Sequence, residues 1–500
     1  MKNSSSCFAL ALALANSVAA QSTDPKQESK KPNILLIMAD DMGYSDLGCY
    51  GSEIQTPNLD RLARQGLRFT GFTNHAKCGP SRTALITGNT MRTEGGRRDI
   101  NLIKELNQAG YRTYMTGKTH GFSRGGTRRS AVMDYGAGSF WDLSSTSTGA
   151  KTTPGHLTLN GKIVPDLAAL HPNFYATDIW TDYAIQFLEE DKADPAPFFL
   201  YVAYNAPHYP MHAKPADIAK YRGKYKEAGW DKLREQRHDR LLKLGILPPG
   251  TPLAPPDPTV PAWDSLSDAQ KDEQDLRMAT YAAMIDCMDQ NIGRLLAEIE
   301  ATGRRDNTLV LFLSDNGGAS ALHKELGKPG PQGSWTYVGK PWAHLSNAPW
   351  RAYKTEHFMG GLRTPLIANW PAVIRPETMD RNFGSIVDVT ATVLDLAGRP
   401  APAILGKSLA PAFYGKPRDL HTEFNWAWNR NKAALKGDWK LVSVKDDPWQ
   451  LFNLASDPVE LCDLAAQHPE KVAELRQQWI DWDANVTFEV EPQGSGKIIP

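Results

Sequence analysis

The chain has no excess of charge of either sign, few cysteines, and no repeats or low-complexity tracts. Its 56 lysines and arginines balance 56 aspartates and glutamates. This balance argues against nucleic acid as a partner, and no polybasic run offers a docking site to an anionic membrane. Five cysteines in 500 residues are too few for a disulfide scaffold, and their spacing matches no zinc motif. We therefore expect Cys49, Cys287 and Cys462 to be core residues or to form one optional bridge.

One apolar run lies at the N-terminus, ahead of the globular part of the sequence. Residues 1–20 contain a cation at Lys2, an apolar stretch over 7–15, and the small residues Val18-Ala19-Ala20. This pattern is typical of a secretory signal peptide and is too short for a membrane-spanning helix. We predict cleavage at its end, a polar tether over 21–31, no integral membrane segment after cleavage, and export to the periplasm or the extracellular space. The alternative is a disordered hydrophobic N-terminus.

Three later apolar runs predict buried β-strands. Residues 34–39, 198–203 and 308–313 are almost entirely apolar, as in strands buried on both faces of a parallel sheet, and polar side chains follow each of them. With 41% hydrophobic residues, the chain is large enough for one big α/β domain and a smaller partner. Ligands bind at the carboxyl ends of strands in doubly wound sheets, so the three strand ends indicate one shared crevice.

Oxygen-bearing side chains follow two of these runs. Asp40-Asp41 comes after the first and Asp315-Asn316 after the third. Taken singly, an acidic pair is more often a helix cap or a turn. Together, the four side chains supply the hard oxygen ligands that calcium or magnesium prefers, and they include no soft or imidazole ligand that would favour zinc or copper.

The most informative segment is Cys78-Gly79-Pro80-Ser81-Arg82, which continues into an apolar stretch ending at Gly88. Pro80 is tolerated in the first turn of a helix, where free backbone N–H groups attract anions. Arg82 adds a permanent cation suited to an oxyanion or to holding a carboxylate. The thiol of Cys78 would lie at the start of this helix, where a thiol is most easily deprotonated to the reactive thiolate. For the motif alone, the alternative is a buried cysteine at an ordinary turn before a helix.

The whole run, with Leu85 and Thr87-Gly88 at matching spacing, closely resembles the signature of the formylglycine-dependent sulfatases of the alkaline phosphatase superfamily. The resemblance implies that a formylglycine-generating or sulfatase-maturing enzyme oxidises Cys78 to an aldehyde, whose hydrate is the nucleophile. It also implies that one calcium ion is held by the modified cysteine and four further residues. The resemblance identifies these ligands as Asp40, Asp41, Cys78, Asp315 and Asn316.

Other segments match the same family. Gly117-Lys118-Thr119-His120 and Ala206-Pro207-His208 match its pattern, and Lys354 stands where the family has a catalytic lysine. Taken by itself, a Lys-x-His pattern is more typical of a solvated loop. His208 by itself is more typical of a turn residue whose hydrogen bonds are satisfied within the protein. The chain departs from the family at Thr119 and in the following Gly121-Phe122, which concern the pocket wall rather than the catalytic pair. It also departs at Met359, where the family usually has glutamate before a glycine pair.

The resemblance implies a role for each matched residue. Arg82 helps to hold the attacking oxygen deprotonated, and Lys118 and Lys354 neutralise the sulfate oxygens. His208 is the candidate to protonate the leaving alcohol. His120 then takes a proton from the second hydroxyl of the hydrate, which releases sulfate.

The resemblance covers nearly the whole chain after the leader and implies an α/β fold. We expect a large doubly wound, mixed and mostly parallel sheet flanked by helices over 32–400, and a smaller C-terminal α+β subdomain with an antiparallel sheet over 401–500. Gly, Ser, Thr and Arg between about 123 and 153 predict long loops. Residues 424–430 depart from the family and are interpreted as a loop in which Trp428 and Arg430 form a substrate platform, because indole faces suit sugar rings. Packing of tryptophans at the domain interface is the alternative.

These features together predict a secreted sulfatase that hydrolyses a sulfate ester, with a sulfated carbohydrate as the expected substrate and aryl sulfates as surrogates. A phosphomonoester or phosphonate hydrolase of the same superfamily, or a sulfamidase that cleaves an N–S bond, would use similar residues. The alternative from another class is a non-catalytic glycan-binding protein with unmodified Cys78. The set of two lysines and two histidines argues against it, because a binding module does not need all four.

Overall fold

The computed structural model describes residues 31–90, 100–120, 126–133, 157–165, 167–171, 173–321, 323–399 and 404–485. The chain divides into two units, Met1–Lys31 and Pro32–Pro500, and the fold below is that of the second unit. The predicted signal peptide lies outside the described residues, as does most of the segment 123–153. No helix in the described part of the chain is long and apolar enough to cross a membrane.

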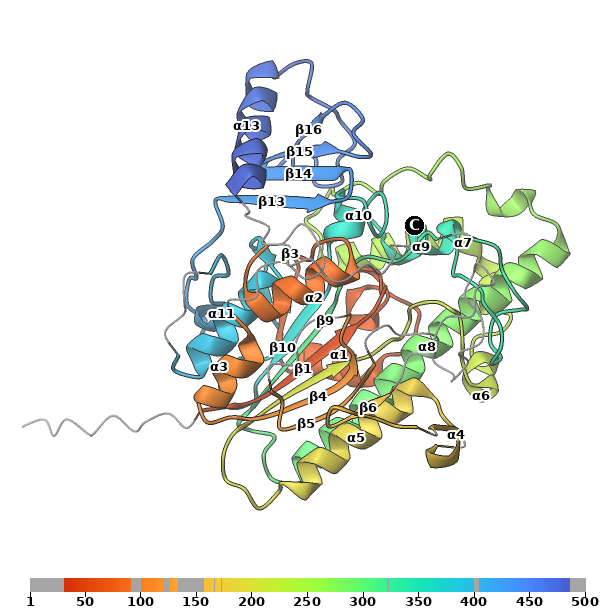
Figure 1. The fold of residues 1–500 in the computed structure, drawn as a ribbon. Coiled ribbons are helices and arrows are strands. Elements are labelled where there is room, and N and C mark those ends of the chain that lie inside the picture. The colour runs from red at the N-terminus through yellow and green to blue at the C-terminus, as the bar shows by residue number, and fades with distance from the viewer. Residues whose placement is uncertain are drawn as a thin grey trace, which may run out of the picture. The chain divides into compact units, whose positions relative to one another are not determined.

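A ten-stranded sheet lies at the centre of this unit (Figure 1). Its strands, in spatial order, are β11 (Thr378–Asp380), β2 (Leu67–Phe69), β10 (Leu366–Asn369), β9 (Thr308–Ser314), β1 (Asn33–Ala39), β8 (Phe198–Ala203), β4 (Arg112–Lys118), β5 (Arg129–Met133), β6 (Thr158–Leu159) and β7 (Lys162–Ile163). The neighbours β9, β1, β8 and β4 run parallel, whereas β10 is antiparallel to β9. The predicted mixed, mostly parallel sheet is confirmed.

The three predicted apolar strands are the adjacent strands β9, β1 and β8, and every residue in them is buried. Side chains of a strand alternate between faces, so successive residues of β1 enter two different cores. Leu35 and Ile37 belong to one core, and Leu36 and Met38 belong to the other. Helices must therefore cover both faces.

Two groups of helices cover the sheet (Figure 1). One group packs around the long helix α8 (Asp268–Ala301) and consists of α1 (Pro57–Arg64), α5 (Ala176–Glu190), α6 (Pro215–Ala219) and α7 (Lys224–Lys243). The other group consists of α2 (Cys78–Thr87), α3 (Leu102–Gln108) and α11 (Val387–Leu396). Helix α8 begins at a capping box formed by Ser267 and Gln270.

The remaining described elements are short. They are η1 (Gly48–Tyr50), η2 (Trp263–Ser265), α4 (Leu167–Leu170), α9 (Lys340–Ser346), α10 (Met359–Leu362), α12 (Ala410–Phe413), and the two-stranded pair β3 (Phe72–Thr73) and β12 (Gly384–Ser385).

The C-terminal region forms a separate four-stranded antiparallel sheet, as predicted. It consists of β13 (Glu423–Trp428), β14 (Asn431–Lys436), β15 (Trp439–Ser443) and β16 (Gln450–Asn453), and α13 (Pro469–Asn485) packs on it. One face, with Ala434 and Leu441, packs against Leu475 and Trp479 of α13. The opposite face, with Trp426, joins the core that also contains α2 and α11.

Two sequence interpretations are wrong. The strand β5 lies inside the segment predicted to be loops, because its residues are buried by pairing in parallel with β4. Residues 424–428 form most of the strand β13 rather than a loop. Trp426 in this strand is fully buried and donates from its indole N–H to the Asn74 carbonyl at 3.0 Å, which agrees with the interface alternative for this residue.

Candidate functional site

The ends of β1 and β9 place the four predicted oxygen ligands together. The backbone N–H of Asp41 donates to Oδ1 of Asp315 at 3.3 Å, and the Asn316 amide donates to Oδ1 of Asp41 at 2.7 Å. All four side chains are buried. Asp41 has a φ of 64°, which is costly for a residue other than glycine and is retained where surrounding contacts hold it. The chain therefore turns sharply after β1 and brings Asp41 against the residues that follow β9.

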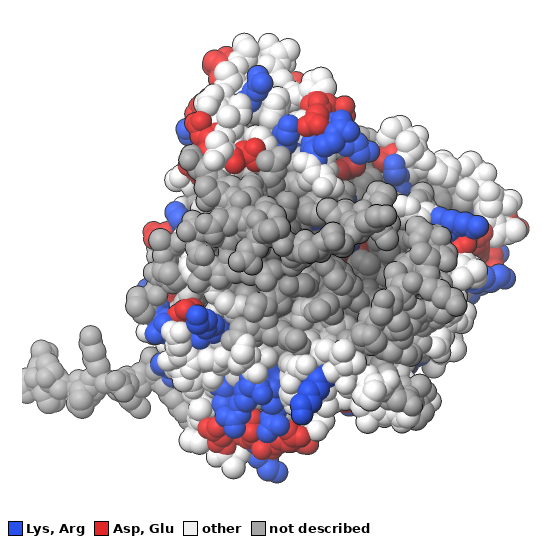
Figure 2. All heavy atoms as spheres, in the orientation of Figure 1, with Lys and Arg blue, Asp and Glu red and all other residues white. Residues whose placement is uncertain are grey.

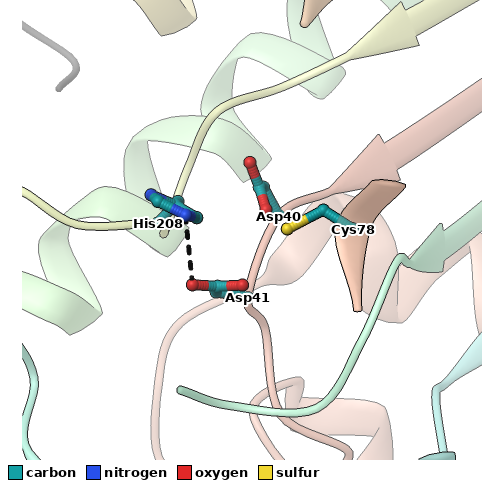
Figure 3. Close-up of side chains that lie close together, drawn as sticks. All are labelled: Asp40, Asp41, Cys78 and His208. Atoms are coloured by element: carbon teal, nitrogen blue, oxygen red, sulfur yellow. Dashed lines mark ion pairs between the residues drawn. The ribbon is translucent and has the colours of Figure 1, made fainter. Parts of the chain in front are cut away.

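The next two strands bring the predicted basic residues. Lys118 ends β4 and donates to Oδ2 of Asp40, to which it is ion-paired. His208 follows β8, and its Nε2 lies 3.5 Å from Oδ2 of Asp41 (Figure 3). His120 lies two residues beyond β4, half-buried and with a φ of 54°. Because β9, β1, β8 and β4 are adjacent and parallel, their carboxyl ends form one site.

Helix α2 begins with Cys78 and faces this site. Figure 3 shows the Cys78 sulfur beside Asp40, and only 1% of the residue is exposed. The preceding Lys77 is extended, and the Ser81 hydroxyl accepts a hydrogen bond from the His75 N–H at 2.9 Å. Gly88 ends the helix with a φ of 70°. The predicted turn and helix are thus both present.

Arg82, one turn along α2, is fully buried and links three parts of the site. Its Nε donates to Oδ2 of Asp315 at 2.8 Å, and a terminal nitrogen donates to the Lys118 carbonyl at 3.1 Å. A second terminal nitrogen lies 3.7 Å from Oδ2 of Asp40. The side chain therefore connects α2 to the ends of β1, β4 and β9. It holds the carboxylates of Asp40 and Asp315 and the carbonyl of Lys118.

Lys354 reaches the site from the loop between α9 and α10. Its ammonium group donates to Oδ1 of Asp41 and is buried. The loop is fixed on either side, because the Lys354 N–H donates to the Gly318 carbonyl at 3.2 Å and the Thr355 N–H donates to the Ala76 carbonyl at 2.6 Å. Each of the two acidic residues after β1 is therefore paired with one lysine.

The electrostatics of the site are dominated by burial and by these pairs. Burial opposes ionisation of Asp40, but Lys118 and the neighbouring cations hold its pKa well below its usual value. Burial disfavours the charged form of Lys354, but Asp41 holds its pKa well above the usual range. Burial lowers the pKa of His208 to about 4, against the opposing charge of Asp41. At neutral pH the site contains charged lysines and a neutral His208.

Four side chains are close enough to share one metal ion. The candidate ligand atoms of Asp40, Asp41, Cys78 and His208 all lie within 4.8 Å of one another (Figure 3). Three buried oxygens here have no hydrogen-bond donor, namely Asp40 Oδ1, Asp41 Oδ2 and Asn316 Oδ1. Acceptors without donors in a buried site fit an oxygen-binding cation. His208 was not predicted as a ligand. The Asp315 carboxylate accepts from the Asp41 N–H and from Arg82.

Trp428 and Arg430 lie at the turn between β13 and β14. The Lys77 ammonium lies 5.7 Å from the ring centroid of Trp428, so this indole is next to the residue before Cys78. Arg430 is exposed, and its Nε donates to Asp446 at 2.7 Å. Figure 2 shows charged side chains of both signs over the C-terminal sheet. A substrate role for Trp428 and Arg430 stays a prediction.

Two contacts were missed by sequence reasoning. The Tyr281 hydroxyl of α8 donates to Oδ2 of Asp46 at 2.8 Å and lies 3.2 Å from the Asp41 carbonyl. No sequence signal connects residues 240 positions apart in this way. Tyr209 stacks on His208 with ring centroids 4.1 Å apart. The sequence did contain a signal for the Tyr209 contact, because Tyr209 directly follows the Ala-Pro-His segment.

The four described cysteines are free. Cys49 and Cys287 are buried, in agreement with the predicted core positions. Cys462 is exposed, so its prediction as a core residue or a bridge partner is wrong.

Comparison with known proteins gives a consistent result. Residues 32–399 match the sulfatase family model, and residues 353–482 match the model described as N-sulphoglucosamine sulphohydrolase, C-terminal. The chain is 31% identical to an uncharacterized sulfatase of Schizosaccharomyces pombe, over 93% of this chain and 96% of that protein. It is 32% identical to an arylsulfatase of Klebsiella aerogenes, over 79% of this chain and 95% of the relative.

A solved structure supports the same assignment. The crystal structure of Ps i-CgsB in complex with k-i-k-neocarrahexaose has a TM-score of 0.68 and 26% identity, and the match covers 92% of this chain and 94% of that one. The family model spans most of the chain and includes every residue of the site described above except those of the β13–β14 turn. The chain therefore belongs to the sulfatase family and is a sulfatase, an enzyme that hydrolyses sulfate esters.

Proposed function

We propose that this sulfatase is an exported, calcium-dependent enzyme that uses a formylglycine made from Cys78 and acts on a sulfated carbohydrate. The observation that carries the proposal is the buried group of Cys78, Asp40, Asp41 and His208 at the start of α2 and the ends of β1 and β8. A purely structural cysteine has no need of two carboxylates and two lysines around it. A binding protein with unmodified Cys78 is correspondingly disfavoured.

The residues present fit a calcium ion. Asp40, Asp41 and Asn316 each have a buried oxygen without a donor, and Asp315 and the modified Cys78 complete the proposed ligand set. Bound calcium would supply positive charge that stabilises a negatively charged attacking oxygen. Arg82 supports the same charge balance, because it neutralises Asp315 and lies near Asp40.

The two lysines are proposed to bind the sulfate group. Lys118 and Lys354 are both buried, and their carboxylate partners raise their pKa values, so both remain cationic at neutral pH. Two fixed ammonium groups in a site shielded from water would neutralise the sulfate oxygens more strongly than solvated ones. The formylglycine hydrate would supply the nucleophilic oxygen and a second hydroxyl.

The two histidines are proposed to move protons. Burial keeps His208 neutral, but the negative charge of a sulfate ester beside it would raise its pKa and allow it to protonate the leaving oxygen. Lys354, which donates to the other carboxylate oxygen of Asp41, is proposed to assist. His120 is proposed to accept the proton whose loss releases sulfate.

Localisation and maturation follow from the predicted leader and from Cys78. We propose removal of residues 1–20, a tether over 21–31, a catalytic domain over 32–400 and a C-terminal subdomain over 401–500. Export would place the enzyme in the periplasm or outside the cell. A formylglycine-generating or sulfatase-maturing enzyme would be its partner during biogenesis.

A sulfated sugar is the proposed substrate class, and two observations support it. The Trp428 indole lies next to Lys77, the residue before Cys78, and one solved relative was crystallised in complex with k-i-k-neocarrahexaose. A second candidate reaction is cleavage of an N–S bond, because the C-terminal part matches a model described as N-sulphoglucosamine sulphohydrolase. Glucosamine N-sulfate belongs in the same substrate screen.

The test combines the mass of the Cys78 peptide with turnover. Protein purified from its native host should show the mass decrease expected when the CH₂SH group becomes CHO. It should hydrolyse 4-nitrophenyl sulfate faster than 4-nitrophenyl phosphate, and Cys78→Ser should keep the fold and lose turnover, because a serine ester has no second hydroxyl with which to expel sulfate. An unmodified Cys78 in fully active protein would refute the formylglycine mechanism, and preferential phosphate turnover would favour the phosphohydrolase alternative.

A further inference from the structure

The aromatic side chains beside His208 form a wall that the proposed mechanism does not use. The Tyr209 ring stacks on the His208 imidazole, with centroids 4.1 Å apart and planes inclined by 29°. Its centroid lies 4.6 Å from that of Tyr337 and 6.4 Å from that of Trp335. Tyr209 therefore packs against His208 as well as against Tyr337 and Trp335.

This wall borders the reacting centre. Asp41, Tyr209 and Tyr337 line one small cavity, so two rings of the wall lie next to a proposed metal ligand. Tyr337 is buried, whereas Tyr209 and Trp335 are partly exposed. Tyr209, which stacks on His208, and Trp335, which packs edge to face against Tyr209, are therefore the rings of the wall that are open to a ligand.

The loop over 323–338 holds these rings in place. Leu326 and Trp335 exchange two backbone hydrogen bonds, at 3.0 and 2.7 Å, and the Met211 N–H donates to the Thr336 carbonyl at 3.1 Å. The Trp335 indole N–H donates to the Tyr337 hydroxyl at 2.8 Å. The polar atom of the indole is thereby satisfied within the protein, and the ring is oriented before any ligand binds.

An ion pair fixes the base of the same loop. Glu325 accepts from the Tyr337 N–H at 2.9 Å and pairs with Arg277 of α8. Arg277 also donates to the Tyr337 carbonyl. These contacts connect the wall to the longest helix of the fold, so the wall is part of the rigid structure.

We propose that Tyr209 and Trp335 bind the ring of the leaving alcohol, which makes them specificity-determining residues. The inference rests on the proposed function, in which His208 protonates that alcohol. Aromatic faces bind the C–H face of a sugar or the face of an aryl ring, the chemistry common to both. Trp428 is a weaker candidate for this role, because Lys77 lies over its ring.

The experiment measures ligand binding to the full chain in a Cys78→Ser background, so that no ligand is consumed. Calorimetry compares N-acetylglucosamine 6-sulfate, 4-nitrophenyl sulfate and inorganic sulfate, which has no ring. Trp335→Ala should weaken binding of a ring ligand about tenfold and leave inorganic sulfate unchanged. Trp335→Phe should restore most of the affinity, and the matched control Trp428→Ala should change the ring ligands less than Trp335→Ala does.

The outcomes separate the possibilities. A loss confined to the sugar, or confined to the aryl sulfate, supports the wall and identifies which ring it takes. An equal loss of affinity for all three ligands means that Trp335 only maintains the fold, and this result overturns the proposal. An unchanged affinity in Trp335→Ala, or a parent protein that binds neither ring ligand, also overturns it. In protein with native Cys78, Trp335→Ala should raise KM more than it lowers kcat. If the native enzyme hydrolyses no sulfate ester, the proposed function fails while the binding result still decides the role of the wall.

Discussion

Asp41 is held by four side chains from three separate parts of the chain. Its carboxylate accepts from Asn316 and Lys354 and lies near His208, and its backbone N–H donates to Asp315. A residue with a left-handed backbone and a buried charge is stable only with such support. Each of these partners is therefore expected to affect the site through Asp41 as well as through its own chemistry.

Removal of the Lys354 ammonium group tests whether this partner of Asp41 also acts on the substrate. Lys354→Ala should lower kcat/KM for an aryl sulfate by about 100- to 1,000-fold, because one fixed cation at the sulfate is lost. The matched control is Lys436→Ala, which removes an exposed lysine of β14 and should leave kcat/KM unchanged. A loss below about tenfold, with the melting temperature preserved, would show that Lys354 only balances the charge of Asp41.

At this scale the sequence predicted the acidic pairs and the basic residues because each directly follows a strand or matches a family motif. The apolar run before Asp40 is sufficient to place it at a strand end. The contact of Tyr281 with Asp41 was not predictable, because it depends on how α8 packs over β1, and local sequence does not encode this packing. The exposure of Cys462 has the same cause, since its short segment alone does not reveal whether another element covers it.

At the scale of elements, the ends of β1 and β9 should be stabilised by calcium. A ligand that binds only the folded state stabilises it by about 2.7 kcal/mol at a hundredfold excess over Kd. Chelation should therefore lower the melting temperature, and calcium should restore it. Asp41→Asn should abolish this dependence, whereas Asp446→Asn, which changes an exposed carboxylate in the turn after β15, should retain it. An unchanged melting temperature of the parent protein on chelation would contradict the calcium site.

The β13–β14 turn is joined directly to the loop of Lys354. The Asn431 amide donates to the Thr355 carbonyl at 2.7 Å, and its oxygen accepts from the Lys445 N–H at 2.8 Å. Asn431→Ala should lower the free energy of unfolding by about 1–3 kcal/mol and also reduce kcat, because Lys354 precedes Thr355. Glu423→Ala, at the exposed far end of the same hairpin, is the control. Reduced stability with an unchanged kcat would limit the turn to a structural role.

Elements with long apolar runs were predictable, and those stabilised by neighbours were not. The strands β1, β8 and β9 are buried on both faces, so their composition alone identifies them. The strand β5 lies among Gly, Arg and Ser residues and exists because β4 supplies its hydrogen bonds. The strand β13 has one fully buried indole, at Trp426, and a half-exposed one, at Trp428, so its sequence did not distinguish a strand from a loop.

At the scale of the whole folded unit, a buried ion pair links the C-terminal sheet to the catalytic part. Lys440 of β15 and Glu460 are fully buried and lie 2.6 Å apart, and the other Glu460 oxygen accepts from the Met359 N–H at 2.7 Å. The Glu460 carbonyl also accepts from Arg351 at 2.8 Å. The pair therefore lies between the C-terminal sheet and the loop that carries Lys354.

Breaking this pair should destabilise the fold strongly. Lys440→Met should lower the free energy of unfolding by about 3–5 kcal/mol, because it leaves the Glu460 carboxylate buried without its partner. The double variant Lys440→Met with Glu460→Gln should recover much of the loss, since the amide still accepts from Met359. Urea unfolding gives both values, and Lys436→Met, in an exposed pair, should have no measurable effect. Equal stability of the single and double variants would mean that the charge of Glu460 is not the cause.

The burial of Cys78 also sets an order of events in time. In the finished fold this side chain is almost fully covered, so an enzyme that converts it must reach the chain earlier. The central strands β1 and β9 pair residues about 275 positions apart, and pairings between distant segments form slowly. The same long-range topology that assembles the site thus delays its closure, and that delay is the interval in which the proposed maturing enzyme would act.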